Sequence, residues 1–234
     1  MKFEKKLETA TIIKRYKRFL ADVTLENGEV VTAHTANTGS MKTCWEPGWK
    51  VAVSYHDDPK RKLKYSLELT HNGETWIGVN TSIPNKLAYK SIQENKIPEL
   101  MGYESIKPEA TIGKSRIDLL LKSSDKPDCY VEIKNVSMKA EDGRAVFPDA
   151  VSDRGLKHLE ELAGIKREGM RAVMLYIIQR EDVSEFRPAI EIDPAYAHAL
   201  KRVHAEGVEI LAYRCKVSIK AVEIDCALPV FLDF

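Results

Sequence analysis

Two neighbouring segments of the chain are rich in branched apolar residues, Lys114-Ser-Arg-Ile-Asp-Leu-Leu-Leu121 and Cys129-Tyr-Val-Glu-Ile-Lys-Asn-Val136. Such runs are typical of β-strands. Residues 122–128 between them contain Ser, Asp and Pro, which favour turns. The sequence therefore predicts a β-hairpin over residues 114–136.

Three charged side chains interrupt this apolar hairpin. Glu132 and Lys134 share one face of a strand, whereas Val131 and Ile133 face a core on the other side. Asp118 can join them from the first strand. One or two carboxylates are enough to hold Mg²⁺, or Mn²⁺ in its place, and a nearby lysine can position the attacking water. We therefore predict Asp118, Glu132 and Lys134 as catalytic residues, the two carboxylates also binding the metal; the alternative is a solvated sheet face.

A loop and a helix follow the hairpin. Residues 153–164 have apolar side chains at helical spacing, with Ser152 or Asp153 as the predicted N-cap and Gly164 as the predicted end. Cationic side chains at the start of a helix oppose its dipole unless an anion is bound there. Phosphate contacts are therefore predicted for Arg154, Lys157 and His158; the alternative is a surface helix whose charges are unlinked.

The order and spacing of several motifs resemble known protein families. Asp118 followed by Glu132-Ile-Lys134 is similar to the pattern of the PD-(D/E)XK nuclease superfamily. Over the whole chain, the motifs resemble those of the bacterial sugar fermentation stimulation protein family; they include Asn37-Thr-Gly-Ser-Met41, Ser115-Arg-Ile-Asp118, Phe147-Pro-Asp-Ala150 and Arg154-Gly155 with Lys157-His158. The resemblance implies a DNA-binding protein linked to the regulation of sugar, notably maltose, metabolism. It also implies an OB-type barrel, a PD-(D/E)XK-like domain and an extra acidic metal ligand upstream, for which Glu99 and Glu109 are the candidates.

The two parts of the chain differ in their patterns. Up to about residue 80, short alternating apolar runs are separated by turn signals such as Asn27-Gly28 and Asn72-Gly73, which is typical of a small barrel. Beyond it, predicted helices alternate with apolar strands such as Arg171–Ile178. We therefore predict an OB-like β-barrel over residues 1–82 and a mixed α/β, PD-(D/E)XK nuclease-like domain over residues 83–234.

Basic residues cluster in the predicted barrel, although the net charge of the chain is only +1. Such clusters attract backbone phosphates, and the tyrosines among them can stack on unpaired bases; the alternative is a solvated face. No segment resembles a recognition helix, so we expect contacts that do not depend on base sequence, to single-stranded, duplex or branched DNA. The predicted nucleic-acid contacts are Lys14, Arg15, Lys17, Arg18, Arg61, Lys62 and Arg116, together with Arg154, Lys157 and His158.

The composition excludes several classes of protein. No apolar run approaches the ~20 residues that span a bilayer, and the first residues lack the apolar stretch of a signal peptide, so we expect a cytoplasmic protein. The four cysteines form no C-x-x-C pair and are expected to be free thiols. Three functions remain open: a DNA-binding regulatory protein, a Mg²⁺-dependent nuclease or resolvase, and a module that binds RNA or another anion. The sequence does not determine the oligomeric state.

Overall fold

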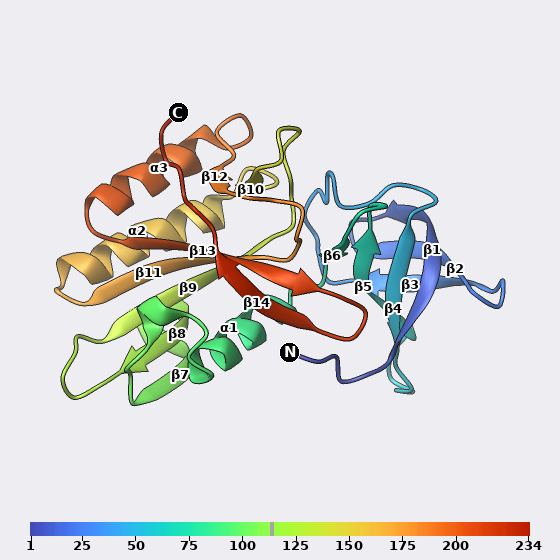
Figure 1. Ribbon diagram of the computed structural model, residues 1–234, viewed down its shortest axis with the longest axis horizontal. Coiled ribbons are helices and arrows are strands. Elements are labelled where there is room, and N and C mark those ends of the chain that lie inside the picture. Colours follow the sequence, from blue (N-terminus) through green and yellow to red (C-terminus); the bar gives the residue numbers. More distant parts are fainter. Residues whose placement is uncertain (113–114) are drawn as a thin grey trace.

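The computed structural model describes residues 1–112 and 115–234 and divides into a barrel and an α/β domain that lie side by side (Figure 1). Lys114, the first residue of the predicted hairpin, lies outside the described residues. None of the helices described is long and apolar enough to cross a membrane.

The barrel is formed by the first strands of the chain. Alternate side chains such as Ile12, Val23 and Val53 fill its core, because successive residues of a strand face opposite sides. The strands pair in the order β3-β2-β1-β4-β5-β6, and a parallel pairing between β3 and β5 closes five of them into a barrel. This is the predicted OB-type architecture. Its strands are β1 (Leu7–Tyr16), β2 (Leu20–Leu25), β3 (Val30–Thr35), β4 (Lys50–Tyr55), β5 (Tyr65–His71) and β6 (Trp76–Gly78).

A six-stranded mixed sheet in the order β14-β13-β11-β9-β8-β7 organises the second domain. β11 is parallel to both of its neighbours and almost completely buried, as its continuous apolar sequence predicts. The outer strands pair antiparallel. The strands are β7 (Ser105–Ile112), β8 (Ser115–Lys122), β9 (Cys129–Val136), β11 (Arg171–Ile178), β13 (Glu209–Val217) and β14 (Val222–Ala227).

Helices cover both faces of this sheet (Figure 1). α1 (Ile83–Gln93) packs on one face together with residues of the barrel, and a short 3₁₀ helix, η1 (Pro98–Leu100), follows it. α2 (Asp153–Arg167) and α3 (Pro194–Ala205) pack on the other face. Two short strands, β10 (Ala145–Phe147) and β12 (Phe186–Pro188), form a separate parallel pair.

The end predicted at Gly164 for the helix that became α2 was wrong. Ser152 caps α2 as expected, its hydroxyl accepting a hydrogen bond from the Gly155 amide, but the helix passes through Gly164. The buried Ile165 extends the apolar stripe beyond that glycine, so packing outweighs the poor helix propensity of glycine. Gly169, with φ of +85°, follows the helix end instead.

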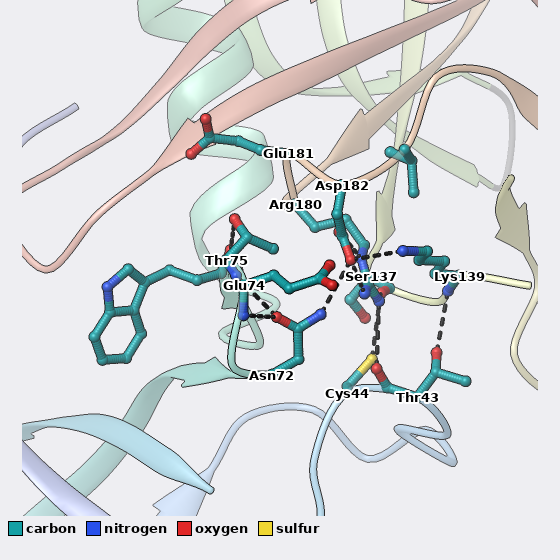
Figure 2. Close-up of polar contacts among 12 residues, drawn as sticks. Thr43, Cys44, Asn72, Glu74, Thr75, Ser137, Lys139, Arg180, Glu181 and Asp182 are labelled. Atoms are coloured by element: carbon teal, nitrogen blue, oxygen red, sulfur yellow. Dashed lines mark hydrogen bonds and ion pairs between the residues drawn. The ribbon is translucent and has the colours of Figure 1, made fainter. Parts of the chain in front are cut away.

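A buried polar network joins the two domains. Figure 2 shows Arg180 at its centre, paired through two nitrogens with Asp182 at 2.7 and 2.8 Å. The Arg180 guanidinium also donates to the Ser137 carbonyl at 2.8 Å and to the Thr43 carbonyl of the barrel at 3.3 Å. From the barrel, Asn72 donates to Asp182 at 3.0 Å. These contacts fix the orientation of the barrel against the α/β domain.

The four cysteines are free thiols, as predicted. Burial raises the pKa of the Cys129 thiol to about 12.

Candidate active site

The predicted hairpin forms, as β8 and β9, and it holds the three charged residues. Leu119 lies opposite Val131, and the pairing of the two strands ends there. Ile117 packs in the core under α2, whereas Leu119 packs in the core under α1, so the alternation of the strand is interrupted at Asp118. The Asp118 carboxylate takes the place of the missing ladder bond, because its Oδ2 accepts from the Ile133 amide at 2.8 Å.

Asn85 in the first turn of α1 fixes the other oxygen of Asp118. Its Nδ2 donates to Asp118 Oδ1 at 2.7 Å. No sequence pattern predicted a role for Asn85, because the 33 positions between it and Asp118 leave no local signal.

Glu132 and Lys134 share a face of β9, as predicted, while Val131 and Ile133 lie in the opposite core. Lys134 Nζ donates to Glu132 Oε1 at 2.8 Å. The Glu132 side chain is only 3% exposed, and its other oxygen, Oε2, is buried without a hydrogen-bond partner among the described residues. A buried carboxylate oxygen in this state is energetically unfavourable unless it binds a further group.

His158 from α2 completes this cluster. Its Nε2 accepts from Arg154 Nε at 3.4 Å, which places the proton of a neutral ring on Nδ1. Nδ1 then donates to Glu132 Oε1, and Lys134 Nζ lies 3.0 Å from the same nitrogen. His158 is buried, so the alternative of an ordinary surface histidine does not hold.

The electrostatics of the two carboxylates differ. Burial and the charge of Glu132 raise the pKa of Asp118. Burial alone would also raise the pKa of Glu132, but the hydrogen bond from His158 and the ammonium of Lys134 outweigh it and lower that pKa. Ionised Asp118 is therefore destabilised beside an ionised Glu132, and a cation between the two would relieve the repulsion.

The residues fit a hard divalent cation. Mg²⁺ keeps several waters and is held by one or two carboxylates together with substrate phosphates. Glu132 Oε2 and the remaining lone pairs of the Asp118 carboxylate supply such oxygens. The described residues contain no group of three or more His, Cys, Asp or Glu side chains arranged to hold a metal, so water and substrate would complete the coordination.

Neither upstream glutamate shares this site. Glu99 accepts a hydrogen bond from the Tyr213 hydroxyl, and Glu109 binds Arg116 at 2.9 Å on the surface. Glu109 lies between Pro108 and Ala110, which pair with Leu119 and Ile117, but its side chain points to solvent and 72% of it is exposed. The same ion pair engages the guanidinium of Arg116, which was predicted to contact nucleic acid.

The remaining cation at the start of α2 is outside the cluster. Lys157 is exposed and lies 3.5 Å from Glu161. It remains available to a phosphate that approaches His158 and Arg154 from solvent.

The basic residues of the barrel have different surroundings. Arg15 is partly buried and donates to the carbonyls of Asn37 at 2.8 Å and Gly39 at 3.0 Å, so it holds a loop of the protein. Lys14 lies 3.5 Å from Asp22. Lys17 and Arg18 are exposed in the turn between β1 and β2, and Arg61 donates to Ser66 whereas Lys62 is exposed.

Comparison with known proteins is consistent with this architecture. Residues 13–79 match the family described as SfsA N-terminal OB domain, and residues 82–221 match the Sugar fermentation stimulation protein RE domain. The chain is thus an OB barrel joined to a restriction endonuclease-like domain. It belongs to the sugar fermentation stimulation protein family.

Similar proteins share this arrangement over their whole length. The chain is 51% identical to the sugar fermentation stimulation protein homolog of Maricaulis maris, covering 100% of both chains. The homolog of Geotalea daltonii is also 51% identical, over 95% of this chain and 96% of the relative. A solved structure, Pyrococcus furiosus SfsA in complex with Ca²⁺, is 29% identical with a TM-score of 0.87 and covers 99% of this chain and 98% of its own.

Proposed function

We propose that this protein binds DNA and cleaves its phosphodiester bonds with a divalent cation, Mg²⁺ or Mn²⁺, held by Asp118 and Glu132. The observation that carries the proposal is the buried Oε2 of Glu132, which has no hydrogen-bond partner in the described part of the chain, beside a second carboxylate whose pKa is raised. The Ca²⁺ complex of the Pyrococcus furiosus relative supports a divalent cation in this fold.

Each residue of the site has a role in this chemistry. The cation, when bound, polarises the phosphate and lowers the pKa of a bound water. Lys134, whose side chain is 13% exposed, can orient the attacking water and stabilise charge that develops on the phosphate. His158 and Asn85 orient the two carboxylates through the hydrogen bonds described above, as outer partners of metal ligands commonly do.

The exposed cations support binding to the DNA backbone. Lys17, Arg18 and Lys62 lie on the barrel and Lys157 lies beside the site, all in reach of solvent. Contacts to phosphates do not read the base sequence, so we propose binding without sequence specificity.

A second function is favoured by a different observation. Lys134 and His158 both donate to Oε1 of Glu132, so this part of the cluster is already paired within the protein. Such a network can stabilise the fold or bind a phosphate without cutting it, and the protein would then act as a DNA-binding regulator of sugar metabolism, in line with the names of its relatives.

Incubation with labelled DNA separates the two functions. Single-stranded, duplex and branched DNA would be run on gels after incubation in Mg²⁺, Mn²⁺ or chelator, with RNA as competitor. Cutting that requires the metal supports the nuclease. DNA that is retarded and uncut in every lane would refute cleavage and favour the regulator. Labelled DNA that is displaced from the protein by competitor RNA would favour an RNA-binding module.

A further inference from the structure

A cavity of about 220 Å³ lies where the barrel meets the α/β domain. The loop at residues 36–39 forms its wall on the barrel side, and Thr81 lies between the domains. Asn135 and Ser137 at the end of β9, with Met138, Phe147 and Asp149, form the opposite wall. Two sequence motifs that the catalytic site does not use, residues 37–41 and 147–150, therefore meet at this cavity.

The wall on the barrel side is held rigidly. The Arg15 guanidinium donates to the Asn37 and Gly39 carbonyls at 2.8 and 3.0 Å. Asp149 Oδ2 accepts from the Met41 amide and the Ser40 hydroxyl, both at 3.2 Å. A Cβ on Gly39 would lie 2.4 Å from the same oxygen, so only glycine allows the two loops to approach this closely. The cavity is thus preorganised.

The lining is largely polar, and none of the described residues that form it is a Lys, Arg or His. A phosphate would find no cation there. Among the described residues, the Asn135 Nδ2 and the Thr38 hydroxyl have no hydrogen-bond partner, and Asn135 Oδ1 is fixed by Gln179 Nε2 at 2.6 Å. Phe147 borders the cavity while its ring packs against Tyr176 and Tyr196, and the Asp149 carboxylate can accept an N–H. Uncharged donors beside an acceptor match the hydrogen-bonding edge of a nucleobase.

The cavity adjoins the candidate active site along two elements. Asn135 directly follows Lys134 on β9, about 3.3 Å further along the strand. Thr81 precedes α1 by two residues, and Asn85 in the first turn of that helix binds Asp118. The Asn135 side chain faces the side of β9 opposite to Lys134, so a strand whose phosphate reaches Lys134 would meet this cavity around the end of β9.

We propose that the cavity receives one unpaired nucleobase of the bound strand, an inference that rests on the proposed function. Unstacking a base from intact duplex costs a few kcal/mol, and the least for a mismatched or single-stranded base. The protein would therefore favour single-stranded, mismatched or branched DNA over paired duplex.

The test uses the full chain and a single-stranded oligonucleotide that carries 2-aminopurine at one position, moved along the strand in a series. Binding is measured by anisotropy in Ca²⁺ and again in chelator, and base unstacking by 2-aminopurine fluorescence. Thr38 is exposed at the cavity, so Thr38→Trp fills the space without replacing a core residue. Thr11→Trp, at an exposed position that does not line the cavity, is the matched control.

We expect the fluorescence to rise several-fold at one position of the series with the wild type and Thr11→Trp. Thr38→Trp should abolish the rise and weaken binding about tenfold. Binding without a rise at any position, or an equal rise with Thr38→Trp, would overturn the base site and leave DNA binding intact. Absence of binding by the wild type would overturn the proposed function too. Displacement of the signal by free nucleosides would support a base site in the cavity.

Discussion

The amide of Asn85 donates to Asp118 Oδ1 at 2.7 Å and thereby connects α1 to the charged end of β8. The other oxygen of the same carboxylate is held by the Ile133 amide of β9. Asp118 is therefore oriented by two elements that the sequence places far apart, and its position depends on both.

Replacing Asn85 by Ala should weaken divalent-metal binding about tenfold, because partners that orient a ligand typically contribute at least this much. Titration of Ca²⁺ by calorimetry measures the effect without relying on cleavage. Gln93→Ala, at an exposed position in the last turn of α1, is the control. An unchanged metal affinity in Asn85→Ala would show that Asp118 is not a ligand or needs no support.

Replacing Asp118 by Asn should abolish cleavage and leave the fold as stable or more stable. Burial and Glu132 raise the pKa of Asp118, so its ionised form destabilises the native state at neutral pH. Asparagine removes that charge and keeps the shape; its oxygen can still accept from the Ile133 amide, while its NH₂ group requires the Asn85 amide to turn and accept. We expect the free energy of unfolding to rise by about 1 kcal/mol in denaturant titrations without metal. A clear loss of stability would contradict this account of the site.

His158→Ala should lower the free energy of unfolding by about 2 kcal/mol, since it removes a hydrogen bond to a buried charged group. His198→Ala, at an exposed position on α3, serves as the matched control and should change stability little. Equal, small effects of the two replacements would mean that the contact between His158 and Glu132 contributes nothing to stability.

The link between the domains predicts a pH dependence. Burial would raise the pKa of Asp182, but the hydrogen bonds and charges of Arg180 and Lys139 outweigh it and hold that pKa far below its ordinary value. A carboxyl with a lowered folded-state pKa stabilises the protein fully above its unfolded pKa of about 3.9, and this stability is lost as the pH falls through the folded-state value.

Asp182→Asn should therefore cost about 3 kcal/mol of unfolding free energy at neutral pH, because Arg180 is left buried without its ionic partner. The difference from the wild type should shrink as the pH falls below about 4. Chemical denaturation across that range measures both effects. A difference that stays constant or grows in acid would contradict the assignment.

Replacing the exposed basic residues of the barrel should affect DNA binding, whereas replacing Arg15, which bonds within the protein, should affect stability. Lys17 and Arg18 have φ values of 50° and 65°, so Lys17→Gly with Arg18→Gly removes their charges and suits the turn. This double change should reduce the slope of log affinity for duplex DNA against log salt by about 1.8. Arg15→Ala should mainly lower stability, because that side chain holds the loop at residues 37–40. An unchanged slope in the double variant would exclude the turn from the DNA interface.

Local patterns predicted much of the fold. The alternation in β9 and the continuous apolar run of β11 depend on burial by neighbouring strands, which the sequence expresses directly. The predicted end of α2 at Gly164 was wrong because the packing of Ile165 outweighs the poor helix propensity of Gly164.

The site was predictable only in part. Glu132 and Lys134 are two residues apart, so their common face follows from strand geometry. The contact of Asn85 with Asp118 and that of Arg15 with residues 37–40 depend on tertiary approach, and residue type alone does not distinguish an engaged guanidinium from a free one.

Cleavage and DNA affinity of Lys134→Ala, measured side by side with the wild type in Mg²⁺, test the central claim most directly. Lys201→Ala, which removes an exposed lysine on α3, is the control. If Lys134 acts on the transition state, its removal should lower the cleavage rate by about 10²-fold or more and leave the affinity for DNA within a few-fold. Equal losses of cleavage and affinity, or unchanged cleavage, would contradict a catalytic role for this site.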